Sequence, residues 1–159
     1  MPHPGTCSSS TRAEIHFCNN LSGTKPLERW RQQRNSVQHH LRQTLVCSLS
    51  QMKEEDLLTE LKHLCTELID YVSTGHSSIY RHNSSSATRP ARGCRGIQSE
   101  IQHHIGINTD HVLSFNQKYE WTDAQLMPGS LQNSLHNDLV KLHRSLSLRF
   151  ALEEQLLEL

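Results

Sequence analysis

The stretch of sequence that decides the fold is EEDLLTELKHLCTELIDYVSTGHSSIY, residues 54–80. Apolar residues return along it every three or four positions, at Leu57, Leu61, Leu64, Leu68 and Val72. This period places them on one face of an α-helix. Glu54, Glu55 and Asp56 stand at the start, where the helix dipole favours negative charge. We therefore predict an amphipathic helix over residues 54–80.

Three further segments have the same helical period, at residues 24–45, 97–119 and 130–159. Thr24 is a suitable cap for the first of them, with Pro26 in its first turn, and Ser130 is a suitable cap for the last. The apolar stripes include Trp30, Val37 and Leu41, then Ile97, Ile101, Ile105, Val112 and Phe115, then Leu135, Leu139, Leu142, Leu146 and Phe150. No segment alternates as a strand does. The expected fold is all-α, an up-down four-helix bundle.

Two stretches lack this period. Residues 1–23 are rich in Ser, Thr, Asn, Pro and Gly, which predicts a disordered N-terminal arm before a single helical domain over residues 24–159. Residues 81–96, RHNSSSATRPARGCRG, contain four Arg and no acid, and we expect a mobile loop there.

Composition excludes several classes of protein. Lys plus Arg (16) balances Asp plus Glu (16), so no overall field attracts the chain to nucleic acid or to a membrane. Five cysteines without a C-x-x-C pair do not indicate a disulfide framework or a zinc site. No apolar run is long enough for a membrane span or a signal peptide, so a cytoplasmic protein is expected. No cofactor and no enzymatic motif can be assigned.

The outer face of the predicted 54–80 helix holds a set of small polar side chains. At about 100° per residue, Asp70 falls opposite the apolar stripe, and Thr66, Ser73 and Ser77 fall close to it. These four residues form a polar ridge, either an ordinary solvated face or a surface for a partner. Gly75 falls on the core side, where it permits a close helix crossing.

Three other residues of these helices are assigned to the core. Cys65 lies on the apolar stripe of the 54–80 helix, and Trp30 lies on that of the 24–45 helix. His76 falls at the edge of the core, which predicts a packed histidine.

Three blocks of the sequence resemble one known family. Residues 64–80, LCTELIDYVSTGHSSIY, resemble the signature F-C-x-x-L-V-D-Y-x-S-x-G-H-F-x-I-Y of the regulator of sigma D family (Rsd/AlgQ). Residues 28–30 (ERW) and 149–154 (RFALEE) are similar to its first-helix and last-helix motifs, and residues 114–116 (SFN) to a weaker one. Ser77 stands where the family signature has Phe.

The resemblance implies an anti-sigma factor. Members are helical proteins that bind domain 4 of the primary sigma factor of RNA polymerase and favour alternative sigma factors in stationary phase. Asp70, Ser73, Ser77 and Thr66 would contact that partner, and the arginines of residues 24–45 would add a second contact. We expect the protein to be a monomer or weak dimer. We expect neither direct contact with nucleic acid nor catalysis.

Four alternatives remain from the residues alone. Twelve His in a helical bundle suggest a metal-binding protein, although Glu100-x-x-His103 is the only motif of that kind. An exposed His63 suggests a histidine phosphotransfer module. The arginines of residues 24–45 and 81–96 suggest a basic patch for nucleic acid. The fourth alternative is a diverged helical module that binds another protein partner.

Overall fold

The computed structural model describes the backbone of residues 11–50, 53–85, 94–120 and 129–159, and the side chains of 25–50, 53–77, 94–120 and 133–159. Its four helices are α1 (Thr11–Leu49), α2 (Glu54–Ser85), α3 (Cys94–Tyr119) and α4 (Gly129–Glu158). Within those ranges there is no strand, so the predicted all-α class is confirmed. None of the described helices has an apolar stretch that could span a membrane.

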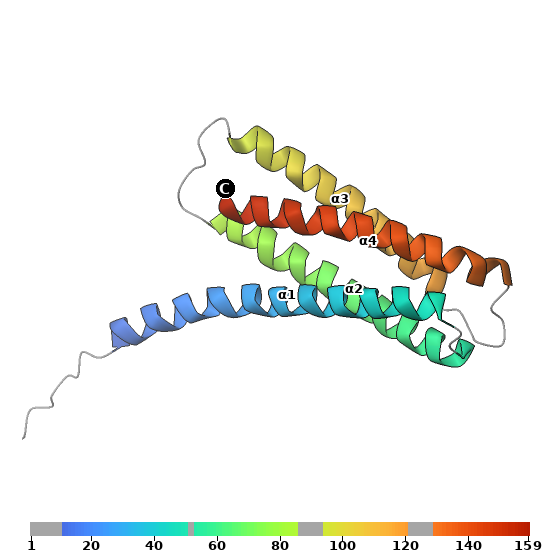
Figure 1. Ribbon diagram of the computed structural model, residues 1–159. Helices are drawn as coiled ribbons and strands as arrows, with labels where there is room; N and C mark the ends of the chain where they lie inside the picture. Colours follow the sequence, from blue (N-terminus) through green and yellow to red (C-terminus); the bar gives the residue numbers. More distant parts are fainter. Residues whose placement is uncertain (1–10, 51–52, 86–93, 121–128) are drawn as a thin grey trace, which may run out of the picture.

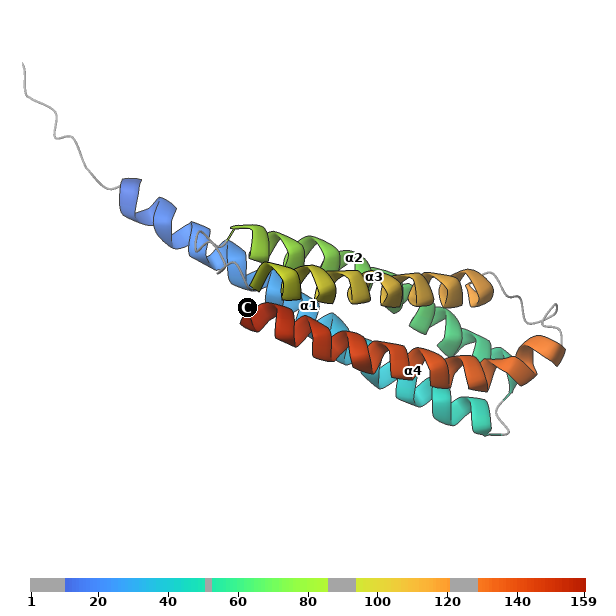
Figure 2. The same ribbon diagram turned by 90° about the horizontal axis from the view of Figure 1, so that it is seen from above.

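The helices run alternately up and down, as predicted (Figure 1). Each helix packs against the next one in sequence, and α1 packs against α4 to close the ring. Helix α2 therefore lies diagonally across from α4, and its outer face is bordered by α1 and α3 (Figure 2). The first turns of α1 extend beyond the other three helices (Figure 1).

The core is made from the predicted stripes. Leu61, Leu64 and Leu68 of α2 are fully buried. The same holds for Trp30 and Val37 of α1. Ile97 was assigned to the stripe of α3 but is 53% exposed, in the first turn of that helix, where burial is less complete than at Ile101 one turn later.

The predicted start of α1 was wrong. The helix begins at Thr11, so residues 11–23 are helical and do not belong to a disordered arm; residues 1–10 lie outside the described part of the chain. Pro26 consequently sits inside the helix and not in its first turn. The polar composition of residues 11–23 concealed this extension, which continues past Pro26 although a proline inside a helix removes one backbone hydrogen bond.

The predicted loop at residues 81–96 is shorter in the structure. Residues 81–85 continue α2, and Cys94 to Gly96 form the first turn of α3. Residues 86–93 lie outside the described part of the chain. Serine and arginine are tolerated at helix ends, where side chains reach solvent, so the composition of this segment overstated the break.

Candidate protein-binding surface

The four residues of the predicted ridge are all exposed on α2. Two of the three hydroxyls fold back on the helix: Thr66 Oγ1 donates to the Lys62 carbonyl at 3.1 Å, and Ser77 Oγ donates to the Thr74 carbonyl at 3.1 Å. Such intrahelical bonds satisfy the hydroxyl hydrogens and leave the side chains close to the helix. The ridge is therefore low, and Asp70 is the one charged side chain among its four members.

Asp70 differs from its acidic neighbour on α2. Within the described residues it forms no hydrogen bond and no ion pair with another side chain. Glu67, one turn earlier, is held by α1: Ser36 Oγ donates to it at 3.0 Å, and Nδ1 of His40 lies 2.5 Å from its other oxygen. Glu67 thus joins two helices, while the carboxylate of Asp70 is left for solvent or a partner.

A buried polar network lies directly beneath the ridge. Tyr71, next to Asp70 in sequence, is fully buried and donates a hydrogen bond to Oε2 of Glu153 on α4. Arg149 Nε donates to the other oxygen of Glu153 at 2.7 Å, and both members of this ion pair are at most 1% exposed. The bond from Tyr71 joins α2 to α4, and the ion pair with Arg149, which lies within α4, holds the Glu153 carboxylate in position for it.

Arg149 also joins α4 to α3. Its Nη1 donates to Thr109 Oγ1 at 2.6 Å and to the carbonyl oxygen of Ile105 at 3.3 Å. The guanidinium group lies over the ring of Tyr71, 5.5 Å from its centroid. One side chain thus fixes three helices relative to one another, with α2 included through Tyr71.

Gly75 permits the approach of α1 to this network. A Cβ atom at position 75 would lie 3.0 Å from Nε1 of Trp30 and 3.8 Å from Oε1 of Glu153. The Trp30 ring is fully buried and stacks on Tyr71, with centroids 6.3 Å apart. The prediction that Gly75 lies on the core side and permits a close crossing is confirmed, as is the burial of Trp30.

Burial controls the ionisation of the network. Loss of water raises the pKa of the Glu153 carboxyl above its ordinary value, although Arg149 opposes the shift. Burial, followed by the charge of Glu153, raises the pKa of the Tyr71 hydroxyl. Burial likewise raises the pKa of the Cys65 thiol to about 12, so this thiol stays protonated at neutral pH and is a core residue, as predicted.

The arginines of α1 divide into two groups. Arg29, Arg31 and Arg42 are exposed. Arg34 forms an ion pair with Glu154 of α4, and its guanidinium group lies 5.1 Å from the centroid of the Trp30 ring. The predicted basic face of this helix therefore has three members with solvent access, and the fourth is bound at the seam between α1 and α4.

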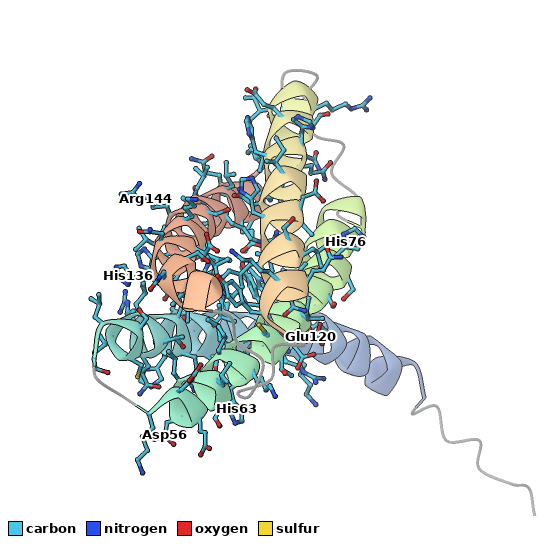
Figure 3. All side chains as sticks on the ribbon, turned by 90° about the vertical axis from the view of Figure 1, so that its right-hand side faces the viewer. Asp56, His63, His76, Glu120, His136 and Arg144 are labelled. Carbon is cyan, nitrogen blue, oxygen red and sulfur yellow. The ribbon has the colours of Figure 1, made fainter. Side chains whose placement is uncertain are left out.

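The histidines have varied surroundings. His76 is exposed, so its predicted packing at the core edge was wrong: the helical period brings it near the core side of α2, but its side chain reaches solvent. His63 is exposed as predicted, and both are labelled on α2 in Figure 3. Glu100 and His103 are exposed on α3, and across the described side chains no three His, Cys, Asp or Glu residues gather as metal ligands would.

The buried ion pair was not predicted from the helical period of the apolar residues. Glu153 follows Phe150 by three positions and Leu146 by seven, which places it on the apolar stripe of α4. Arg149 precedes it by one helical turn, the spacing of an intrahelical ion pair. An opposite-charge pair on an apolar stripe was therefore the available signal.

The fold is thus that of an all-α four-helix bundle with one exposed, low polar ridge and a buried ionic network behind it. The chain belongs to a family described as "Regulator of RNA polymerase sigma(70) subunit, Rsd/AlgQ", whose profile matches residues 16–159. No curated protein and no solved structure gave a significant match. Members of the three resembling blocks meet in the structure, since Trp30, Tyr71, Gly75, Arg149 and Glu153 all belong to the network.

Proposed function

We propose that this protein is an anti-sigma factor that binds domain 4 of the primary, sigma-70-class sigma factor. Binding would block the use of that sigma factor in transcription and favour alternative sigma factors in stationary phase. Asp70 would be the electrostatic anchor, Ser73 and Ser77 the surface of closest approach, and Thr66 its continuation. Membership of a family of sigma-70 regulators supports this proposal.

The observation that carries the proposal is the unpaired carboxylate of Asp70 at the middle of the ridge. The DNA-reading helix of a sigma domain 4 is basic, and an exposed carboxylate attracts such a surface and opposes an acidic one. A carboxylate that no neighbouring cation neutralises exerts this effect most strongly. Glu67 contributes less because its oxygens are occupied by Ser36 and His40.

The low ridge suits a helix as its partner. Ser73 and Ser77 have short side chains, and those of Thr66 and Ser77 are bonded to the backbone of α2. A helix lying across them can approach the backbone of α2 closely. The buried network behind the ridge holds α2 in place, so little ordering entropy would be lost on binding.

The mechanism is steric occlusion. A sigma domain whose DNA-reading helix lies on α2 cannot contact the −35 promoter element with the same surface. Arg29, Arg31 and Arg42, exposed on the adjacent helix α1, would make a second contact with acidic residues of the partner. No covalent bond is made or broken in this activity, so the protein would regulate as a binding partner and not as an enzyme.

The test is a calorimetric titration of the purified protein with the isolated domain 4 of its host's primary sigma factor. We expect a stoichiometric complex that the Asp70→Lys substitution abolishes, because an ammonium group would then face a basic helix. The matched control is Asp110→Lys, the same charge reversal at an exposed position of α3. Both variants should keep the parent's helicity and melting temperature, since both side chains are exposed.

Two results would contradict the proposal. If the Asp70→Lys variant binds domain 4 with the affinity of the parent, Asp70 does not lie in the interface. Failure of the folded parent protein to bind domain 4 would reject the anti-sigma function itself.

A further inference from the structure

A second surface lies between α3 and α4, where no residue of α1 or α2 contributes. A solvent-exposed groove of about 650 Å³ runs between these two helices, and we call it the α3/α4 groove. Its volume is in the range of binding sites. Arg144, labelled in Figure 3, projects from α4 on the side away from α1 and α2.

The middle of the α3/α4 groove is apolar. Phe115 of α3 and Leu142 of α4 line it, and both are buried at the base. Leu148, one further lining residue on α4, is 54% exposed. A leucine side chain left in water beside buried apolar groups is an unfavourable arrangement that a docked apolar surface would relieve.

Polar bonds between α3 and α4 lie on both sides of Phe115 and Leu142, and Leu148 follows Ser145 by three residues on α4. On one side, Ser145 lies within hydrogen-bonding distance of Asn108 and of His111 Nδ1, at 2.5 and 3.3 Å. On the other side, Asp138 accepts hydrogen bonds from Lys118 Nζ at 2.6 Å and from the Tyr119 hydroxyl at 2.7 Å. These bonds hold the helices at a constant separation, so the groove exists before any ligand arrives.

The charge of the groove is positive. Three cations line it, Lys118, Lys141 and Arg144, against the single acid Asp138. Lys118 and Lys141 both lie within ion-pair distance of Asp138, whereas Arg144 forms no ion pair within the described residues. Burial alone would raise the pKa of Asp138, but the hydrogen bonds from Lys118 and Tyr119 bring it below its ordinary value. The groove therefore has an excess of positive charge, with three cations against one acid, although the net charge of the whole chain is zero.

The length of the groove matches a short helix. Its lining residues on α3 extend from Asn108 to Tyr119, three helical turns and about 16 Å. Apolar residues at the base with cations along the edges are the complement of an amphipathic helix whose apolar stripe is flanked by acids. We propose that the α3/α4 groove is a docking site for an acidic amphipathic helix of a partner protein.

This site differs from the α2 ridge in position and in sign of charge. The ridge presents the carboxylate of Asp70 and suits a basic partner, whereas the groove suits an acidic one. Like charges would repel each partner from the other's site. The inference does not depend on the proposed anti-sigma function, because no ridge residue lines the groove.

The test uses the full chain and a fluorescein-labelled synthetic peptide of about 18 residues, or five turns, with a leucine stripe flanked by glutamates. We expect saturable binding by fluorescence anisotropy that weakens as salt is added. Leu148→Glu should weaken binding by about tenfold, since it places a carboxylate in the apolar stretch. The matched control is Leu113→Glu, which changes a leucine of α3 that is 47% exposed and does not line the groove.

A second variant tests the role of charge. Arg144→Glu should weaken binding several-fold, while Arg95→Glu, at an exposed position of α3 outside the groove, should not. The proposal is overturned if the peptide fails to bind, or if a peptide with lysines in place of the glutamates binds equally well. It is also overturned if the control variants lose as much affinity as Leu148→Glu and Arg144→Glu.

Discussion

A single methyl group added at position 75 should destabilise the protein, although alanine is the better helix former. Gly75 lies in the interior of α2, where replacing glycine with alanine ordinarily stabilises by about 1 kcal/mol. Here the new Cβ would lie 3.0 Å from Nε1 and 3.3 Å from Cδ1 of Trp30. Both distances are shorter than an ordinary van der Waals contact, so the indole ring would have to move.

The indole ring of Trp30 has little room to move away from a new methyl group. Its ring is fully buried, stacks on Tyr71, and lies beneath the guanidinium group of Arg34. Overpacking of a core costs about 1–3 kcal/mol. Subtracting the gain in helix propensity of about 1 kcal/mol leaves a net loss of up to about 2 kcal/mol. For a chain of this size the melting temperature should fall by up to about 8 °C.

The assay is urea unfolding followed by circular dichroism, with thermal melts as a second measurement. Gly106→Ala is the matched control, because Gly106 is exposed in the interior of α3 and a Cβ there would have no atom within 4 Å. That variant should be more stable than the parent by about 0.5–1 kcal/mol. The two glycines should therefore respond to the same substitution with opposite signs. If Gly75→Ala stabilises as much as Gly106→Ala does, the close contact with Trp30 has no energetic consequence and the reasoning fails.

Three further predictions concern the ridge, the buried ion pair and the core thiol. Ser77→Phe places an apolar anchor on the ridge and should tighten binding of sigma domain 4 by about 2 kcal/mol, measured by calorimetry; unchanged affinity would show that position 77 lies outside the interface. Arg149→Met leaves the Glu153 carboxylate without its cation, and should cost about 3–5 kcal/mol in urea unfolding; a loss below about 1 kcal/mol would mean that the pair is not buried as described. The Cys65 thiol, whose pKa burial raises to about 12, should resist iodoacetamide at pH 8 in the folded protein and react after unfolding; mass spectrometry that finds Cys65 labelled as fast as Cys47 would contradict this.

The sequence alone predicted the helices and the face that each presents to the core. Leu61, Leu64 and Leu68 are buried and Asp70 is exposed because burial on a helix follows a period of 3.6 residues, which depends only on local geometry. The same period placed Thr66, Ser73 and Ser77 beside Asp70. Their role in binding a partner remains a proposal.

Helix ends were predicted less well. Thr11 begins α1 and Ser85 ends α2, each beyond the predicted limit. Composition describes how a short peptide would behave by itself, whereas a helix that is already formed can extend into neighbouring polar residues, in α1 even past Pro26.

Only the tertiary structure decided which polar groups are joined. Glu67 and Asp70 are both acids on one helix, yet Glu67 is bound by α1 and Asp70 is not. Tyr71 lies 82 residues before Glu153 in the sequence, yet the two side chains are hydrogen-bonded in the core. The α3/α4 groove likewise arises only where two helices lie side by side. A local period determines the direction in which a side chain points, but its partner depends on the packing of helices that are distant in sequence.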